Sequence, residues 1–328
     1  MTSSARDRVS ACVAERSAAR PPIMLWRHWP GDDQELDSYW RRTRAFQDEF
    51  DLDIIKLCPS GTYLSESWGT QATYQGDLVG TRQAIRAAIT SERDLAAITT
   101  ISPSESIEMT REIDCVSLAS REYGSDAVIL PTLFTPLSVL RHLCGHEQLV
   151  VLARNHPAAF RSALDAITSS LECYVDRLIS AGAAGIYLSA WPASYRIFSE
   201  TEYRDMNEEF DRRVLDSAGS AQLRVLHLHM PDPILGLGVD YPCNAVSWEP
   251  GPQISAFREG AEYVKRTVVG GLDQWGAISL GSRTDVVSEV RQAVAALAGL
   301  SVIFGTYCSL PIYTPGANIR ALVAEVRS

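Results

Sequence analysis

Four side chains at the ends of apolar runs are the residues of this chain best suited to chemistry. The run VLHLHM carries His227 and His229, and Pro231 ends it. Residues two apart on a strand point to the same face, so both imidazoles can reach one point where the strand stops. Glu249 ends the run AVSWE, and Cys308 follows the run VIFGTY. Two imidazoles, a carboxylate and a thiolate form a ligand set suited to zinc, so the sequence predicts a metal site.

Each of these four residues also has an ordinary structural explanation. A histidine at a strand end is often simply hydrogen-bonded, and a lone cysteine is among the residue types most readily buried. The metal site is therefore favoured by the combination and not by any single residue. With the carboxyl and the thiol ionised and both imidazoles neutral, the four ligands balance the +2 charge of the metal.

The elements that must position these residues are short apolar runs alternating with longer helical patterns. Eight runs are expected to be strands: 22–29, 52–58, 127–134, 185–190, 224–230, 244–249, 266–273 and 301–307. Most are continuously apolar, as strands buried on both faces are. Eight strands alternating with helices over about 300 residues predict an α/β fold of the (β/α)8 TIM-barrel type. A doubly wound open sheet is the weaker alternative, because no glycine-rich dinucleotide motif follows an early strand.

Helical patterns fill the intervals between the expected strands. Apolar spacings of three and four predict helices over 156–183, 199–219 and 282–300, with Ser199 and Glu202 forming a capping box. Residues 81–124 are expected to add a helical pair around the short run 95–101. Residues 1–21 are expected to form an N-terminal arm, helical or disordered, and residues 22–328 a single barrel domain.

Further polar and aromatic residues fall at the carboxyl ends of the expected strands, where barrel enzymes carry their active sites. Arg27, Lys56 and Asp273 are candidates for binding substrate, with exposure to solvent an equally good explanation for the two cations. His28 and His142 are candidate acid–base groups. Aromatic side chains are candidates for a pocket wall, although core packing explains them as readily: Tyr63, Tyr187, Trp191 and Tyr307.

Composition narrows the class of protein. The 328 residues are 46% apolar and 21% charged, with a net charge of −10. This charge argues against nucleic acid or an anionic membrane as a partner. No window approaches the ~20 apolar residues of a membrane span. The seven cysteines are odd in number and show no paired spacing, which favours the reducing cytoplasm.

From about residue 23 to 327 the chain resembles the superfamily of uroporphyrinogen decarboxylase, cobalamin-independent methionine synthase and the zinc methyltransferases that serve coenzyme M. The resemblance lies in KLCPSGTYLSESWG, LPTLFTPLSVLRHLCG, SETEYRDMNEEFDRRVL, VSWEP, VVGGLD and GTYCSLPIYTP. The thiol alkyltransferases of this group bind zinc through His-x-Cys, a later acidic residue and a late Cys. These positions correspond here to His227, His229, Glu249 and Cys308. His229 stands where this group usually has Cys. An imidazole nitrogen is a harder ligand than a thiolate sulfur, so a divalent metal other than zinc is an alternative.

The decarboxylase branch of the superfamily has no metal, and most of its site is missing. Arg27 matches one of its substrate arginines in type, within a different motif. The second strand ends at Lys56 without the branch's Asp, and the branch's Tyr position is His142. The late His of that branch falls in the stretch ending at Cys308. The resemblance therefore favours the thiol alkyltransferases.

The leading hypothesis is a metal-dependent alkyl transfer, most simply methyl transfer to a thiol bound as thiolate on zinc. The methyl donor is expected to come from outside, as a methyl-corrinoid on a separate protein or as a folate. The alternatives are a metal-free lyase that acts on a carboxylated substrate through Arg27 and His142, and a non-catalytic protein that binds a corrinoid or a metal.

Overall fold

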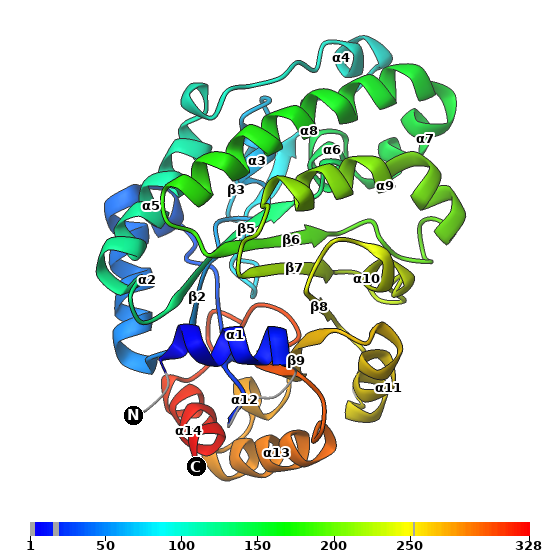
Figure 1. Ribbon diagram of the computed structural model, residues 1–328. Helices are drawn as coiled ribbons and strands as arrows, with labels where there is room; N and C mark the ends of the chain where they lie inside the picture. Colours follow the sequence, from blue (N-terminus) through cyan, green and yellow to red (C-terminus); the bar gives the residue numbers. More distant parts are fainter. Residues whose placement is uncertain (1–3, 16–19, 252) are drawn as a thin grey trace.

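The computed structural model describes residues 4–15, 20–251 and 253–328. Eight parallel strands form a nearly closed barrel, as the alternating pattern predicts (Figure 1). They are β1 (Ile23–Met24), β2 (Ile54–Leu57), β5 (Val128–Phe134), β6 (Gly185–Ala190), β7 (Leu223–Leu228), β8 (Ala245–Trp248), β9 (Thr267–Leu272) and β10 (Val302–Thr306). All eight expected runs contain a strand, and the open-sheet alternative is excluded.

Helices surround the barrel, and the three predicted from apolar spacing are confirmed. They are α8 (Pro157–Ser180), α9 (Glu200–Ser217) and α13 (Arg283–Ala296). The Ser199 side chain caps α9 by accepting from the Glu202 N–H. The other helices are α1 (Ala5–Glu15), α2 (Leu36–Phe50), α3 (Tyr63–Glu66), α4 (Glu92–Ala96), α5 (Ile107–Tyr123), α6 (Pro136–Cys144), α7 (His146–Asn155), α10 (Gly236–Asp240), α11 (Ile254–Val264), α12 (Ala277–Leu280) and α14 (Gly316–Arg327), with short 3₁₀ turns η1 (Asp32–Gln34) and η2 (Pro103–Glu105).

The segment 81–124 contains its expected pair of helices, α4 and α5, but begins with a strand. Its beginning forms β4 (Gln83–Arg86), which pairs antiparallel with β3 (Gln71–Thr73) outside the barrel. The 3₁₀ turn η2 lies between the two helices. The helical reading fails at 83–86 because these exposed residues bury no apolar face, so backbone pairing with β3 decides their conformation.

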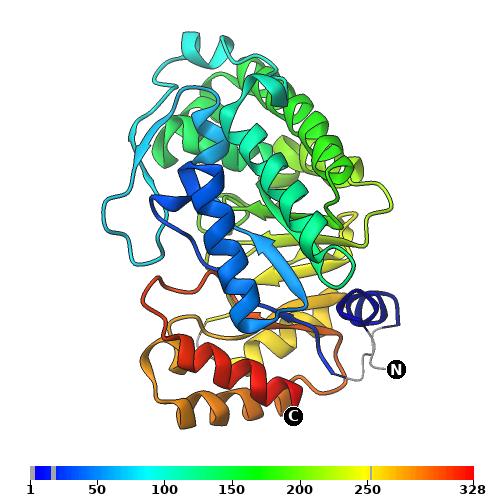
Figure 2. The ribbon, with the colours of Figure 1, turned by 90° about the vertical axis from the view of Figure 1, so that its left-hand side faces the viewer.

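Helix α1 covers the amino ends of the strands. Val9 and Cys12 are buried against interior residues that begin several strands, including Ile54 and Leu223. Hydroxyls of Thr267 and Ser301 donate to the Cys12 carbonyl. Figure 2 shows α1 (dark blue, right) and the segment around β3 and β4 (light blue, left) on opposite sides of the barrel. The described part of the expected arm thus forms a helix that closes the barrel at the amino ends of its strands. Residues 1–3 and 16–19 of the arm lie outside the described residues.

The barrel has one seam without a strand ladder. Hydrogen-bonded neighbours run from β1 through β10 and back to β2, but β1 and β2 are not paired. The Asp53 carboxylate bridges this gap by accepting from the Ile23 N–H at 2.8 Å and from Arg8 and Arg20. An N–H that a neighbouring strand would otherwise satisfy is therefore bonded to a side chain. No helix in the described part of the chain is long and apolar enough to cross a membrane.

Candidate metal centre and its cavity

The carboxyl ends of the strands open into a cavity of about 710 Å³. Its wall is formed by residues at the ends of β1, β2 and β5 to β10, together with residues 81–87 around β4. The fold therefore gathers the polar strand ends around a space large enough for a small organic substrate.

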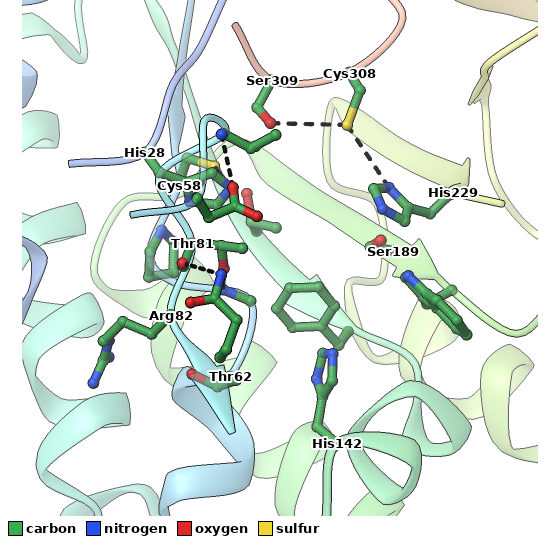
Figure 3. Close-up of a pocket in the computed structure, with 18 of the residues that line it drawn as sticks. His28, Cys58, Thr62, Thr81, Arg82, His142, Ser189, His229, Cys308 and Ser309 are labelled. Atoms are coloured by element: carbon green, nitrogen blue, oxygen red, sulfur yellow. Dashed lines mark hydrogen bonds between the residues drawn. The ribbon is translucent and has the colours of Figure 1, made fainter. Parts of the chain in front are cut away.

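Three of the four predicted metal ligands meet in this cavity. His227 lies in β7, His229 follows that strand directly, and Cys308 lies two residues beyond β10. One ligand atom from each lies within 4.8 Å of the others, and the residues are buried or half-buried. Figure 3 shows the Cys308 thiol pointing at the His229 ring, with His28 and Cys58 on the other side of the view.

The spacing of the three ligand atoms fits a tetrahedral metal. His227 Nε2 and His229 Nδ1 are 3.1 Å apart, and Cys308 Sγ is 3.7 Å from His229 Nδ1. Tetrahedral zinc with bonds of about 2.05 Å to nitrogen and about 2.3 Å to sulfur separates two nitrogens by about 3.3 Å and a nitrogen from sulfur by about 3.6 Å. At 3.1 Å the two nitrogens can share a proton when no metal is bound, or both can turn a lone pair to a metal held between them. The residues present fit zinc.

The sheet register orients the His227 ring. His227 pairs with Ser247 of β8, so both side chains point into the barrel. His227 Nδ1 lies 3.1 Å from Ser247 Oγ, which also accepts a hydrogen bond from the Tyr187 hydroxyl at 3.4 Å. With Nδ1–H donating to Ser247, the lone pair of Nε2 faces the cluster. This is the outer contact that metal-ligating histidines usually have.

Cys308 and His229 stabilise each other in charged forms. Burial by itself raises the pKa of the Cys308 thiol, but the charge of His229 and hydrogen bonds from both histidines outweigh it and hold this pKa well below its usual range. Burial likewise lowers the pKa of His229, and the Cys308 charge reverses that effect to give a raised pKa. The lowered pKa favours the thiolate, which is the form of cysteine that binds a metal.

Glu249, the fourth predicted ligand, lines the same cavity but lies outside the cluster of three. It follows β8 directly and is half-buried. Burial, and next the negative charges of Cys308 and Asp273, raise the pKa of its carboxyl. Cys308 N–H donates at 3.2 Å to Gln274, whose side chain also hydrogen-bonds Glu249. Glu249 is thus a neighbour of the cluster through Gln274.

Lys56 and Tyr187 lie together in the cavity wall. Lys56 Nζ donates to Thr132 Oγ1 at 2.7 Å and sits 4.1 Å from the centre of the Tyr187 ring and 4.6 Å from that of Trp26. Burial lowers the pKa of Lys56. No carboxylate pairs with this ammonium in the described chain, so cation–π contacts hold it.

Both candidate acid–base histidines also line the cavity. His28 contacts the Cys58 thiol at 3.5 Å, and burial lowers the pKa of His28 while raising that of Cys58 to about 11. Burial, with the charge of Arg141, lowers the pKa of His142 to about 3. At neutral pH His142 is therefore uncharged. It can accept a hydrogen bond but cannot act as a general acid.

Three predicted substrate-binding residues do not line the cavity. The guanidinium of Arg27 donates to the Ile312 carbonyl, because Trp26 and His28 on either side of it face inward and the alternating chain sends Arg27 outward. The Tyr63 hydroxyl is buried and donates to the Thr132 carbonyl at 2.7 Å. The Asp273 carboxylate accepts from the Trp275 N–H at 2.9 Å and orders the turn after β9.

The sequence reading missed Arg141 as a cavity residue. It lies in α6 and stacks over Trp191, with its guanidinium carbon 3.7 Å from the ring centre. Arg82 was also missed, and its guanidinium is paired with Glu66 at 2.6 Å. The signal available for Arg141 was its place beside the singled-out His142 in an otherwise apolar helix.

The sequence matches the model of the uroporphyrinogen decarboxylase (URO-D) family over residues 38–328. The chain belongs to this family. A methyltransferase from Methanosarcina mazei has a similar structure, with a TM-score of 0.86 at 17% identity, over 99% of this chain and 98% of that one. A B12-independent methionine synthase from Shewanella sp. W3-18-1 is similar with a TM-score of 0.56 at 12% identity, over 94% and 92% of the two chains. No curated protein matches the sequence. These comparisons confirm the superfamily resemblance and the barrel fold.

Proposed function

We propose that this protein is a zinc-dependent methyltransferase whose acceptor is a substrate thiol. The observation that carries the proposal is the cluster of His227, His229 and Cys308 at the carboxyl ends of the strands. The distances between its ligand atoms match those around a tetrahedral metal. Membership of the URO-D family and the shared fold with a methyltransferase support it. The missing decarboxylase residues argue against the lyase.

The three residues would hold the metal, which would bind the substrate thiol. Zinc bound there supplies a Lewis acid that keeps a coordinating thiol deprotonated at neutral pH. Free thiols have a pKa of ~8.5 and are mostly protonated at that pH. The substrate sulfur would form a bond to the methyl carbon as the bond from that carbon to its donor breaks.

The chain's own residues exclude water from this reaction and position the reactants. Trp26, Tyr187 and Phe134 give the cavity an apolar wall. Glu249 lies next to the cluster and would accept the thiol proton. We place the reaction in the cytoplasm, since none of the seven cysteines forms a disulfide.

The methyl donor is proposed to arrive from outside. A methyl-corrinoid on a separate protein and a folate are the two candidates. The sequence contains no Asp-x-His-x-x-Gly motif for holding a corrinoid itself.

Metal analysis of protein purified without added metal tests the proposal. We expect about one zinc ion, or one other divalent ion, per chain, and loss of that ion in His229→Ala. His142→Ala is the matched control, because His142 lines the same cavity outside the cluster. Equal metal content in all three proteins would show that His229 is not a ligand. A wild-type protein without metal would refute the alkyltransferase hypothesis and make the lyase the leading hypothesis.

A further inference from the structure

Lysine is almost absent from this chain. Of its 30 lysine and arginine residues, only Lys56 and Lys265 are lysines. Lys265 is exposed at the end of α11, whereas Lys56 is 7% exposed and lines the cavity. Arginine stays protonated in proteins, but a buried lysine loses its proton more readily. One of the two side-chain amines of the chain therefore lies in the enclosed space that also contains the predicted metal ligands.

The alternation of β2 directs the Lys56 side chain into the barrel. Ile54 and Cys58, two residues away on either side, belong to the cluster that fills the barrel interior. Lys56 Nζ donates to Thr132 Oγ1 at 2.7 Å, and the Thr132 hydroxyl in turn donates to the Leu57 carbonyl at 2.6 Å. These two hydrogen bonds hold the amine at the wall of the 710 Å³ cavity, where a bound molecule can reach it.

The surroundings of Lys56 favour the uncharged amine over the ammonium. Burial lowers the pKa of Lys56, and the two groups whose charges oppose this are the thiols of Cys58 and Cys308. Burial in turn raises the pKa of Cys58 to about 11, so this thiol is itself uncharged at neutral pH. No carboxylate is paired with Lys56 among the described residues. A desolvated lysine without a counter-ion is the kind of lysine that acts as a nucleophile.

An uncharged amine can attack the carbon of a carbonyl group. The nitrogen forms a bond to that carbon, the carbonyl electron pair moves to the oxygen, and one proton passes from the nitrogen to that oxygen. The hydroxyl then leaves as water with the second nitrogen proton. Amine and carbonyl compound thus give an imine and one water, with no oxidant or reductant.

The neighbours of Lys56 suit both stages of this reaction. Cys58 has a protonated thiol hydrogen-bonded to Lys56, so it can relay a proton from the nitrogen to the oxygen. The ring centres of Trp26 and Tyr187 lie 4.6 Å and 4.1 Å from Nζ. These rings stabilise a protonated imine as they stabilise an ammonium, because both are cations at the same place.

We propose that Lys56 is a covalent binding site for a small aldehyde or ketone, which it holds as an imine inside the cavity. The site goes beyond methyl transfer and needs no metal, because it rests on Lys56 and the groups around its amine. Trp26, Tyr187 and Phe134 line the same cavity, so the carbonyl compound that fits has an uncharged, apolar body.

Reductive trapping on the wild-type protein tests the site. Butanal and its isomer 2-butanone are the probes, each incubated with the protein at pH 7 and then treated with borohydride, which converts an imine into a stable secondary amine. Mass spectrometry of peptides locates the added butyl group. We expect about tenfold or more label on Lys56 relative to Lys265, because each unit by which a pKa falls raises the uncharged fraction about tenfold. The two isomers distinguish an aldehyde site from a ketone site.

Variants assign the label to Lys56. We expect Lys56→Arg, which keeps a cation but forms no imine, to lose the label from the cavity. Lys265→Arg is the matched control and should keep it. Circular dichroism checks that each variant is folded, and the peptide map of the wild-type protein decides the matter even if Lys56→Arg does not fold.

Two results would overturn the site. One is equal labelling of Lys56 and Lys265, and the other is a label found only on Lys265 or on a terminal amine. Either would leave Lys56 as a structural cation held by Thr132 and its two aromatic neighbours. Metal content measured on the same samples tests the proposed function separately, since a Lys56 label in a protein without metal would support the imine site and refute the zinc methyltransferase.

Discussion

At the scale of single residues, the site depends on which nitrogen of His227 carries its proton. Nε2 faces the cluster, so the proton must sit on Nδ1, and Ser247 is the group that holds it there at 3.1 Å. Ser247 is small enough for the interior of the barrel and lies next to His227 in the strand register. A ligand is thus prepared by a neighbour that touches no metal itself.

Replacing Ser247 with alanine should weaken the metal site without abolishing it. We expect Ser247→Ala to lower metal affinity by about 10- to 100-fold, the usual effect of losing such an outer contact. Competition with a chromogenic chelator measures the affinity. Ser189→Ala is the control, because Ser189 faces His227 from β6 in the same register without a hydrogen bond to its ring. Unchanged affinity in Ser247→Ala would mean that another group fixes the tautomer.

At the scale of elements, the pair of glycines in β9 makes room for the segment that carries Cys308. Gly270 has a φ of +150°, and a β-carbon there would lie 2.8 Å from Tyr307 Cδ1 and 2.9 Å from Phe257 Cζ. Tyr307 directly precedes Cys308 and stacks on Phe257 with ring centres 5.0 Å apart. The VVGGLD motif is therefore explained by packing: its glycine lets the chain after β10 approach β9.

Gly270→Ala should consequently affect both stability and the metal. We expect the free energy of unfolding to fall by about 3 kcal/mol from overpacking and strain. We also expect weaker metal binding, because Tyr307 must shift and Cys308 with it. Urea unfolding and chelator competition provide the measurements. Gly299→Ala separates the two causes, since Gly299 has a φ of +84° and a β-carbon added there would meet no atom within 4 Å. Strain alone should cost it about 1 kcal/mol.

Helix α5 buries a carboxyl group that should give the fold a pH dependence. Glu112 is 1% exposed, and burial raises its pKa to about 8. The unfolded value is ~4.3. The folded state therefore holds the proton more tightly, so this contribution to stability is complete below pH ~4.3 and is lost as the pH rises through about 8.

Glu112→Gln should flatten this pH dependence. We expect the variant to match wild type within about 1 kcal/mol near pH 5 and to exceed its unfolding free energy near pH 9 by on the order of 4 kcal/mol. Denaturant unfolding at both pH values is the measurement. Asp114→Asn, an exposed carboxyl on the same helix, should leave the wild-type dependence in place. A steeper loss of stability at high pH in Glu112→Gln would show that the carboxylate is stabilising.

At the scale of the whole molecule, closing the barrel depends on a side chain. Asp53 bonds the Ile23 backbone across the unpaired seam and also binds Arg8 of α1, so one carboxylate joins β1, β2 and the helix that covers the amino ends. The exposed fraction of Asp53 is 1%. Losing its charge removes an ion pair from Arg8 and another from Arg20, both of them part-buried.

Asp53→Asn should therefore lower the free energy of unfolding by about 3 kcal/mol, the cost of breaking a buried ion pair. Chemical denaturation checks this. Asp51→Asn is its control, because the Asp51 carboxylate is 81% exposed and pairs only at the surface with Arg327, a contact worth less than about 1 kcal/mol. Equal loss in both variants would mean that the seam is held by its apolar neighbours.

The sequence by itself determined the barrel fold and which polar residues lie at the carboxyl ends of its strands. Apolar runs and helical spacing are local properties, because burial on both faces of a strand is written into consecutive residues. The two-residue period of a strand likewise placed His227 and His229 on one face. By the same period Arg27 points outward, because its neighbour His28 points into the cavity. The place of Cys308 after the last apolar run singled it out in the same way, although it lies 79 positions from His229.

Only the tertiary structure decided which side chains meet. Glu249 and Cys308 both end strands, yet only Cys308 comes within reach of the histidines, since loop geometry after a strand is not set by the strand's own pattern. The stacking of Arg141 on Trp191 joins a helix to a loop 50 residues away. Such meetings depend on distances of a few ångströms between separate elements, and those follow from packing around the barrel, which no local spacing encodes.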